Sequence, residues 1–162
     1  MRLRPILAAL LLAPLLAPAA GAVARAAKAR DVPVLFWFTS PEMEMDASVA
    51  GSNGAPAYML ASLGARNVIA SDDEWPWVGW ETIARAEPAV IVLAGMDRRF
   101  NEGDDPARKV EFLTTDPVAS RIPAVAAGHY FVMRAEAMNP SMRTIDGIEQ
   151  LADKMVEFGL AE

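Results

Sequence analysis

The sequence predicts a single α/β domain of three layers, in which helices cover both faces of a mainly parallel, four-stranded sheet. Four short apolar runs lack polar alternation, as expected of strands that are buried on both faces; they span residues 34–38, 67–69, 90–93 and 130–133. Segments with helical spacing alternate with these runs, and that order produces a parallel sheet. The length of 162 residues suits one domain, and 53% hydrophobic against 22% charged residues excludes a disordered chain.

The first and third apolar runs are the clearest strands. Residues 34–38 are all aliphatic or aromatic and lie between Pro33 and Thr39, while residues 90–93 are all aliphatic and end before Gly95. Such residues fit a pleated surface that is covered on both sides. The polar, glycine-containing segment 42–54 and the tryptophan-rich segment 71–79 lack a strand pattern, so both are expected to be loops.

Helices are predicted between the strands. Residues 56–63 carry apolar side chains at helical spacing, and Gly64 follows as the residue that ends the helix. A short helix over 80–86 ends before Pro88, because the residue that precedes a proline disfavours helical geometry. The remaining helical segments are 106–113, one or two short turns within 116–127, and an amphipathic helix with Ile145 and Phe158 on one side.

The first 24 residues differ in kind from the rest. Two arginines precede an apolar stretch, and Ala22-Val23-Ala24 fits the cleavage site of a secretory signal peptide. A membrane anchor is the alternative, but the apolar stretch is too short and is interrupted by Pro14 and Pro18. The predicted organisation is therefore a signal-peptide helix at 1–24, a basic lead-in at 25–31 and an exported domain at 32–162.

Composition excludes several kinds of site. The chain has no cysteine, which excludes disulfides, thiolate metal sites and a cysteine nucleophile, and its one histidine, His129, excludes a multi-histidine metal cage. A net charge of −6 without a basic cluster argues against nucleic acid as a partner. No serine lies in the G-x-S-x-G turn of a hydrolase. We therefore expect no enzyme activity, no metal site and no resident cofactor.

Residues suited to ligand binding follow the predicted strands. Because the carboxyl ends of parallel strands share one edge of a sheet, their loops are expected to form a common rim. The candidate ligand-binding residues on these loops are Trp75, Trp77, Arg98, Arg99, Phe100, Asn139 and Arg143. Tryptophan faces suit a flat or bulky ligand, and guanidinium groups suit carboxylates, catecholates or phosphates. The alternatives are a loop that is pinned to the core by its aromatic rings and a solvated arginine pair; Trp80, at a helix start, is expected to pack.

An acidic loop follows the first strand. Glu42, Glu44 and Asp46 lie at two-residue spacing, but the loop lacks the regular ligand set of a calcium loop. A solvated acidic loop is therefore favoured over a metal site. A surface for a basic protein partner is the third interpretation.

The order of segments resembles the C-terminal lobe of the periplasmic proteins that deliver iron–siderophore complexes, haem or cobalamin to ABC importers. The resemblance extends from about Val32 to Leu160 and is carried by the segments 54–60, 63–68, 80–83, 87–93, 115–118, 122–132 and 143–152. It implies a non-catalytic, periplasmic substrate-binding role. It also implies a metal chelate as ligand and an ABC permease as partner.

The resemblance further implies roles for the loops and a departure from the family. Segments 74–77 and 96–100 match loops that face the ligand cleft, and Glu42 or Glu44 matches the role of a carboxylate that docks on the permease. The N-terminal lobe of the family has no counterpart after the leader, so a separate N-terminal lobe is a further expected partner. An interaction module that docks on a permease or another protein, without binding solute, is the alternative function.

Overall fold

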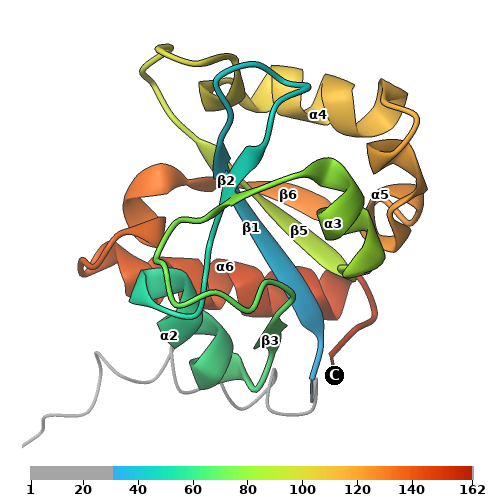
Figure 1. Ribbon diagram of the computed structural model, residues 1–162. Helices are drawn as coiled ribbons and strands as arrows, with labels where there is room; N and C mark the ends of the chain where they lie inside the picture. Colours follow the sequence, from blue (N-terminus) through green and yellow to red (C-terminus); the bar gives the residue numbers. More distant parts are fainter. Residues whose placement is uncertain (1–30, 162) are drawn as a thin grey trace, which may run out of the picture.

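The computed structural model describes residues 31–161 and shows a mixed sheet between two layers of helices (Figure 1). The strands are β1 (Pro33–Thr39), β2 (Ala47–Val49), β3 (Arg66–Asn67), β4 (Trp77–Val78), β5 (Val90–Gly95) and β6 (Tyr130–Arg134). The α-helices are α2 (Gly54–Leu63), α3 (Trp80–Arg85), α4 (Pro106–Thr115), α5 (Pro123–Ala126) and α6 (Arg143–Glu157). Short 3-10 turns are η1 (Glu102–Asp104), η2 (Ala119–Arg121) and η3 (Ala135–Met138). The predicted signal peptide lies outside the described residues.

The predicted fold class is confirmed, and the sheet has two strands more than predicted. The strand order is β4-β2-β1-β5-β6, with β3 beside the start of β1. The pairs of β1 with β3, β1 with β5 and β5 with β6 are parallel, whereas β2 pairs antiparallel with both β1 and β4. The two added strands lie in the segments predicted to be loops, because strands of two or three residues are too short to show a periodic pattern.

Alternating side chains of β1 divide the core between the two faces of the sheet. Val34 and Phe36 belong to one buried cluster, which α2 and α6 cover, and Leu35 and Trp37 belong to the other, which α3, α4 and α5 cover. All four side chains are fully buried. Figure 1 shows α4 on one side of the strands and α2 with α6 on the other. The continuous apolar run thus reflects burial on both faces.

The helix predictions hold with small shifts at the ends. The helix α2 begins two residues earlier than predicted and ends at Gly64, whose φ of 69° is a left-handed conformation that glycine adopts without strain. The side chain of Asp105 accepts a hydrogen bond from the backbone N–H of Ala107 and thus caps α4, and Pro106 occupies the first helical position. The second strand is shorter than predicted: β3 includes Asn67 but not Val68 or Ile69.

Candidate functional site

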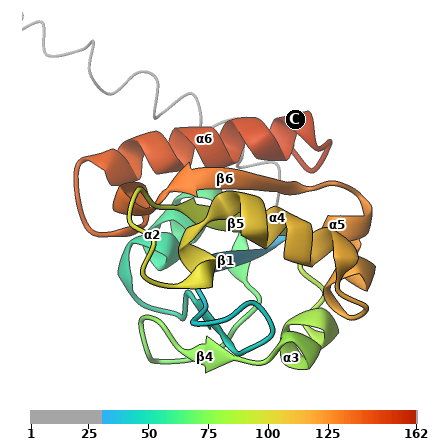
Figure 2. The same cartoon turned by 90° about the horizontal axis from the view of Figure 1, so that it is seen from above.

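The loops that follow β5 and β6 meet beside the carboxyl end of β1. Figure 2, which views the molecule from above, shows that β1, β5 and β6 lie side by side. A hollow of about 500 Å³ opens here, lined by Phe38 and by residues that follow β5 and β6: Met96, Asp97, Arg98, Ala135, Glu136 and Asn139. The parallel pairing of the three strands places these loops at one edge, as the sequence predicts.

Trp75 reaches the same edge by a different route. Its ring packs on Phe38, which lines the hollow, with 4.6 Å between the ring centroids and 43° between the ring planes. The strand β3 pairs with the start of β1, and the chain then lies beside the residues after β2, where the backbone N–H groups of Ser52 and Gly51 donate to the carbonyls of Ser71 and Glu74. The ring of Trp75 therefore packs against the wall of the hollow and is partly buried there.

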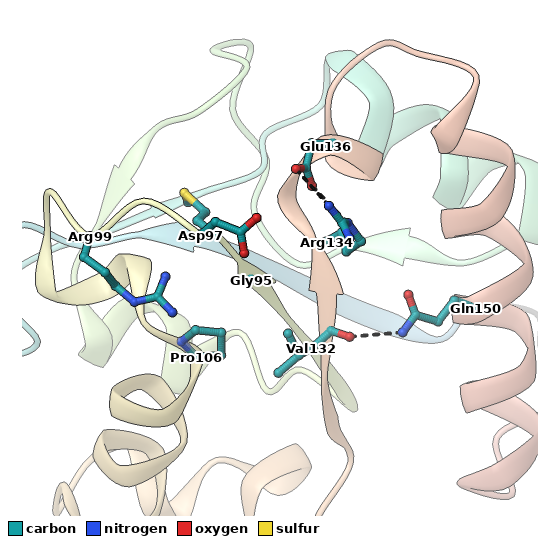
Figure 3. Close-up of a pocket in the computed structure, with 9 residues that line it drawn as sticks. Gly95, Asp97, Arg99, Pro106, Val132, Arg134, Glu136 and Gln150 are labelled. Carbon is teal, nitrogen blue, oxygen red and sulfur yellow. Dashed lines mark hydrogen bonds and ion pairs between the residues drawn. The ribbon is translucent and has the colours of Figure 1, made fainter.

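A second hollow of about 440 Å³ adjoins the first, and Figure 3 shows the side chains around it. Met96, Asp97 and Glu136 line both hollows. The second hollow is completed by Gly95, Arg99, Pro106, Val132, Arg134 and Gln150. The Nε2 of Gln150 donates to the backbone carbonyl of Val132 at 3.0 Å, which links α6 to β6.

The rim carries both signs of charge. The guanidinium of Arg134 pairs with Glu136 at 3.3 Å, so this pair is mutually neutralised. The pKa of Glu136 lies below its usual range because its own backbone N–H and the Arg134 side chain donate to the carboxylate. Arg99 lies 3.7 Å from Asp105, with half of its side chain exposed, and Arg98 lies over the ring of Phe100 at 5.6 Å.

A buried network supports the loop that carries the two arginines. Asp104, in η1, accepts hydrogen bonds from the hydroxyl of Thr39 and from the backbone N–H groups of Phe100 and Asn101. Burial opposes ionisation of Asp104, but these donors outweigh it and lower its pKa. Lys109, which is fully buried in α4, has its pKa lowered by burial to about 7, against an opposing effect of the Asp104 charge.

The predicted ligand-binding residues divide among four hollows and one exposed position. Arg98 and Asn139 line the first hollow, Trp75 packs on Phe38 in its wall, and Arg99 lines the second hollow. Phe100, also predicted to bind ligand, is 82% exposed beside Arg98.

Trp77 and Arg143, the other predicted ligand-binding residues, lie away from the first hollow. Arg143 lines a neighbouring hollow of about 420 Å³ together with Arg134 and Gln150, which also line the second hollow. Trp77 lies in β4 and lines a separate surface hollow with Pro41, Met45 and Asp46.

The acidic loop lies next to Trp77. Glu42 and Glu44 are exposed in the segment between β1 and β2, and Met45 and Trp77 are 50% and 54% exposed. Trp80 packs as predicted: it is 5% exposed, with its ring centroid 4.6 Å from that of Trp37, and its Nε1 has no hydrogen-bond partner within the described part of the chain.

Several rim residues were not predicted from sequence. Asp97, Arg134, Glu136 and Gln150 line the hollows although nothing in their local pattern marks them. Asp97 and Glu136 follow the ends of β5 and β6 by two residues each. This position after a strand is the one feature of the sequence that could have identified them as rim residues. Within residues 31–161, no group of three or more possible ligands is suited to hold a metal ion, and no helix is long and apolar enough to cross a membrane.

Comparisons with known proteins agree with this architecture. A family model described as periplasmic binding protein matches residues 11–137. The chain is similar to a periplasmic binding protein from Veillonella parvula (24% identity, TM-score 0.72), covering 86% of this chain and 47% of that one. It is also similar to an ABC-type Fe³⁺-hydroxamate transport system from Saccharomonospora viridis (20% identity, TM-score 0.70), covering 86% of this chain and 46% of that one. A third similar structure is a periplasmic haem-binding protein from Pseudomonas aeruginosa (21% identity, TM-score 0.67), with 91% of this chain and 50% of that one covered.

The chain thus spans about half the length of these solved structures. A comparison with curated protein sequences gives no match. The shared architecture is that of one α/β unit of those proteins.

Proposed function

The chain belongs to the periplasmic binding protein family, and on that premise we propose that it is the substrate-binding component of an ABC importer, or one lobe of such a component. The proposed cargo is an iron–siderophore complex or a related macrocycle such as haem or cobalamin. The proposed location is the periplasm, the proposed partner is an ABC permease, and no catalysis is involved. A separate N-terminal lobe is proposed as a further partner, because the chain spans about half of its structural relatives.

One observation carries this proposal: a guanidinium and an amide side chain from two loops line one hollow, and an aromatic ring from a third loop packs on Phe38 in its wall. Trp75 packs on its wall, and Arg98 and Asn139 line it. An aromatic face suits the flat surface of a macrocycle, and a guanidinium suits the carboxylate or catecholate oxygens of an iron chelate. The Trp75 ring and the Arg98 guanidinium therefore support cargo of this kind.

We expect weak binding by this lobe alone. The hollows are open to solvent, whereas tight small-molecule sites enclose most of the ligand surface. One-sided contact buries less apolar area, while the loss of translational and rotational freedom on binding stays the same. Contact from a second lobe would raise the affinity without any change in the residues of this rim.

Tryptophan fluorescence tests the proposal. The folded chain is titrated with ferrioxamine, haem and cyanocobalamin, and at least one of them is expected to quench the emission in a saturable manner. Trp75→Phe is expected to remove most of the response, whereas Trp77→Phe, the matched control in the separate hollow, is expected to keep it. No saturable response to any of the three, with a native circular dichroism spectrum, would contradict the proposed cargo.

The second candidate function is docking on a protein partner, favoured by the surface around Trp77. Met45 and Trp77 are half exposed and line one hollow with Asp46, and Glu42 and Glu44 are exposed in the same loop as Met45. Such a surface fits a basic partner such as a permease loop. The double variant Glu42→Lys/Glu44→Lys is expected to weaken capture of the permease and to leave the fluorescence response to cargo unchanged.

A further inference from the structure

A buried lysine bridges the ends of two strands beneath the rim. The Nζ of Lys109 donates hydrogen bonds to the backbone carbonyls of Trp37, Phe38 and Ala94, at 3.2, 2.7 and 2.9 Å. As an ammonium, the form that it takes below its pKa of about 7, the side chain has three donors, and each is matched by one acceptor. Burying a charge is costly unless it is fully hydrogen-bonded, and here the bonds join β1 to β5 where both strands end.

A buried carboxylate fixes the loop that follows β5. Asp104 has no exposed surface; its Oδ1 accepts from the hydroxyl of Thr39 at 2.7 Å, and its Oδ2 accepts from the backbone N–H groups of Phe100 and Asn101 at 2.9 and 3.1 Å. Thr39 is the last residue of β1, and Phe100 comes directly after Arg99. The carboxylate therefore ties the end of the arginine-bearing segment to the end of a core strand.

The same loop also lies in close contact with the acidic loop. The backbone N–H of Gly103 donates to the carbonyl of Ser40 at 3.0 Å, and that of Glu102 donates to the carbonyl of Pro41 at 3.2 Å. A Cβ atom at Gly103 would lie 2.1 Å from the backbone nitrogen of Ser40, so only glycine fits. The segment 100–104 is thus held from the sheet side by Asp104 and from the neighbouring loop by the backbone, while Lys109 fixes Ala94, two residues before Met96.

We propose that Lys109 and Asp104 are positioning residues for cargo binding: they hold the segment 96–105 in one place on the rim, although neither contacts the cargo. This inference rests on the proposed function, because it assigns a cause to the placement of Arg98 and Arg99. Arg98 lines the first hollow and Arg99 the second, so displacement of this one segment changes both. The charged groups of the network are Lys109, Asp104 and, through its effect on Asp104, Arg98.

The variants Lys109→Met and Asp104→Ala test the inference. Lys109→Met keeps the length of the apolar stem and removes the three donors. Asp104→Ala removes the acceptors of the arginine loop, while Asp104→Asn keeps an oxygen for the backbone N–H groups and an amide that can donate to Thr39. Leu113→Ala is the matched control, because Leu113 is equally buried on the same helix but has no part in the network.

Affinity is measured with ferrioxamine, haem and cyanocobalamin well below the unfolding temperature of each variant. Lys109→Met and Asp104→Ala are expected to lower the affinity for cargo about tenfold. This is the effect of losing one hydrogen bond between the cargo and an arginine of the displaced segment. Asp104→Asn is expected to restore most of that loss, and Leu113→Ala is expected to bind as the parent does. Equal affinity in all variants, or an equal loss in Leu113→Ala, would overturn the inference.

Amide hydrogen exchange without cargo separates this inference from the proposed function. The backbone amides of Phe100 and Asn101 are expected to exchange about tenfold faster in Lys109→Met and Asp104→Ala, and at the parent rate in Leu113→Ala. A parent chain that binds none of the three compounds contradicts the proposed function alone. Unchanged exchange of these two amides contradicts the positioning role, whatever the parent chain binds.

Discussion

Replacing Lys109 by methionine is predicted to change how stability depends on pH. Burial lowers the pKa of Lys109 from the ordinary 10.5 to about 7, with the charge of Asp104 acting in the opposite direction. Between these two values the unfolded chain keeps the proton on this lysine, while the folded chain releases it. Because the unfolded state then binds more protons, the free energy of unfolding rises with pH through this interval.

The size of the effect follows from the same two pKa values. One titrating group changes the free energy of unfolding by about 1.4 kcal/mol per pH unit, over the pH range in which the unfolded protein holds one more proton on that group than the folded protein does. Lys109 is fully buried, so solvent does not screen the difference. The free energy of unfolding of the parent, relative to that of Lys109→Met, is therefore expected to rise by roughly 1.4 kcal/mol per pH unit between pH 7 and pH 10. Below about pH 6 this difference is expected not to change with pH.

Urea denaturation followed by circular dichroism measures this difference across the pH range. Subtracting the curve of Lys109→Met from that of the parent removes the contributions of the other titrating groups. Leu113→Ala changes a side chain that does not titrate, so its free energy of unfolding is expected to be lower than that of the parent by the same amount at every pH. A parent-minus-Lys109→Met difference that stays flat with pH would refute the reasoning, because the three carbonyls would then hold the ammonium charged throughout.

Two further predictions concern the loop that carries the arginines. Gly103→Ala is expected to lower the free energy of unfolding by about 1–3 kcal/mol in urea denaturation, because the new methyl group would overlap the backbone nitrogen of Ser40; an unchanged midpoint would contradict this. Arg98→Gln is expected to weaken haem binding about tenfold, and Arg99→Gln less, because Asp105 already neutralises part of the Arg99 charge. Fluorescence titration compares the two variants, and a larger loss in Arg99→Gln would contradict the assignment.

The strands and helices that are buried on a whole face could be predicted from the sequence. The apolar runs of β1 and β5 have one physical explanation, burial between two helix layers, and Gly64 marks the end of α2 by its left-handed geometry. The strands β2 and β4 could not be predicted, because they have only three and two residues. Strands this short are stabilised by the strands they pair with and show no alternating pattern of their own.

The sequence predicts where the rim lies better than it predicts which side chains lie on it. Trp75 and Trp77 are two residues apart, yet they lie at different hollows, because the carbonyl of Pro76 pairs with Val49 and the chain enters β4 there. Lys109 follows a helical pattern in which a lysine normally faces solvent. Its acceptors are carbonyls 15 and more residues away in sequence, so only the folded chain reveals its position.

Mapping a bound cargo onto backbone amides tests the central claim most directly. Cyanocobalamin and the gallium form of the ferrioxamine ligand are diamagnetic, so both permit nuclear magnetic resonance titration of the folded chain. We expect the largest chemical-shift changes, for at least one of them, at Trp75, Arg98 and Asn139, with the amide of Trp77 unaffected. Shift changes confined to the surface around Trp77, or none with either compound, would contradict a cargo site at the carboxyl ends of β1, β5 and β6.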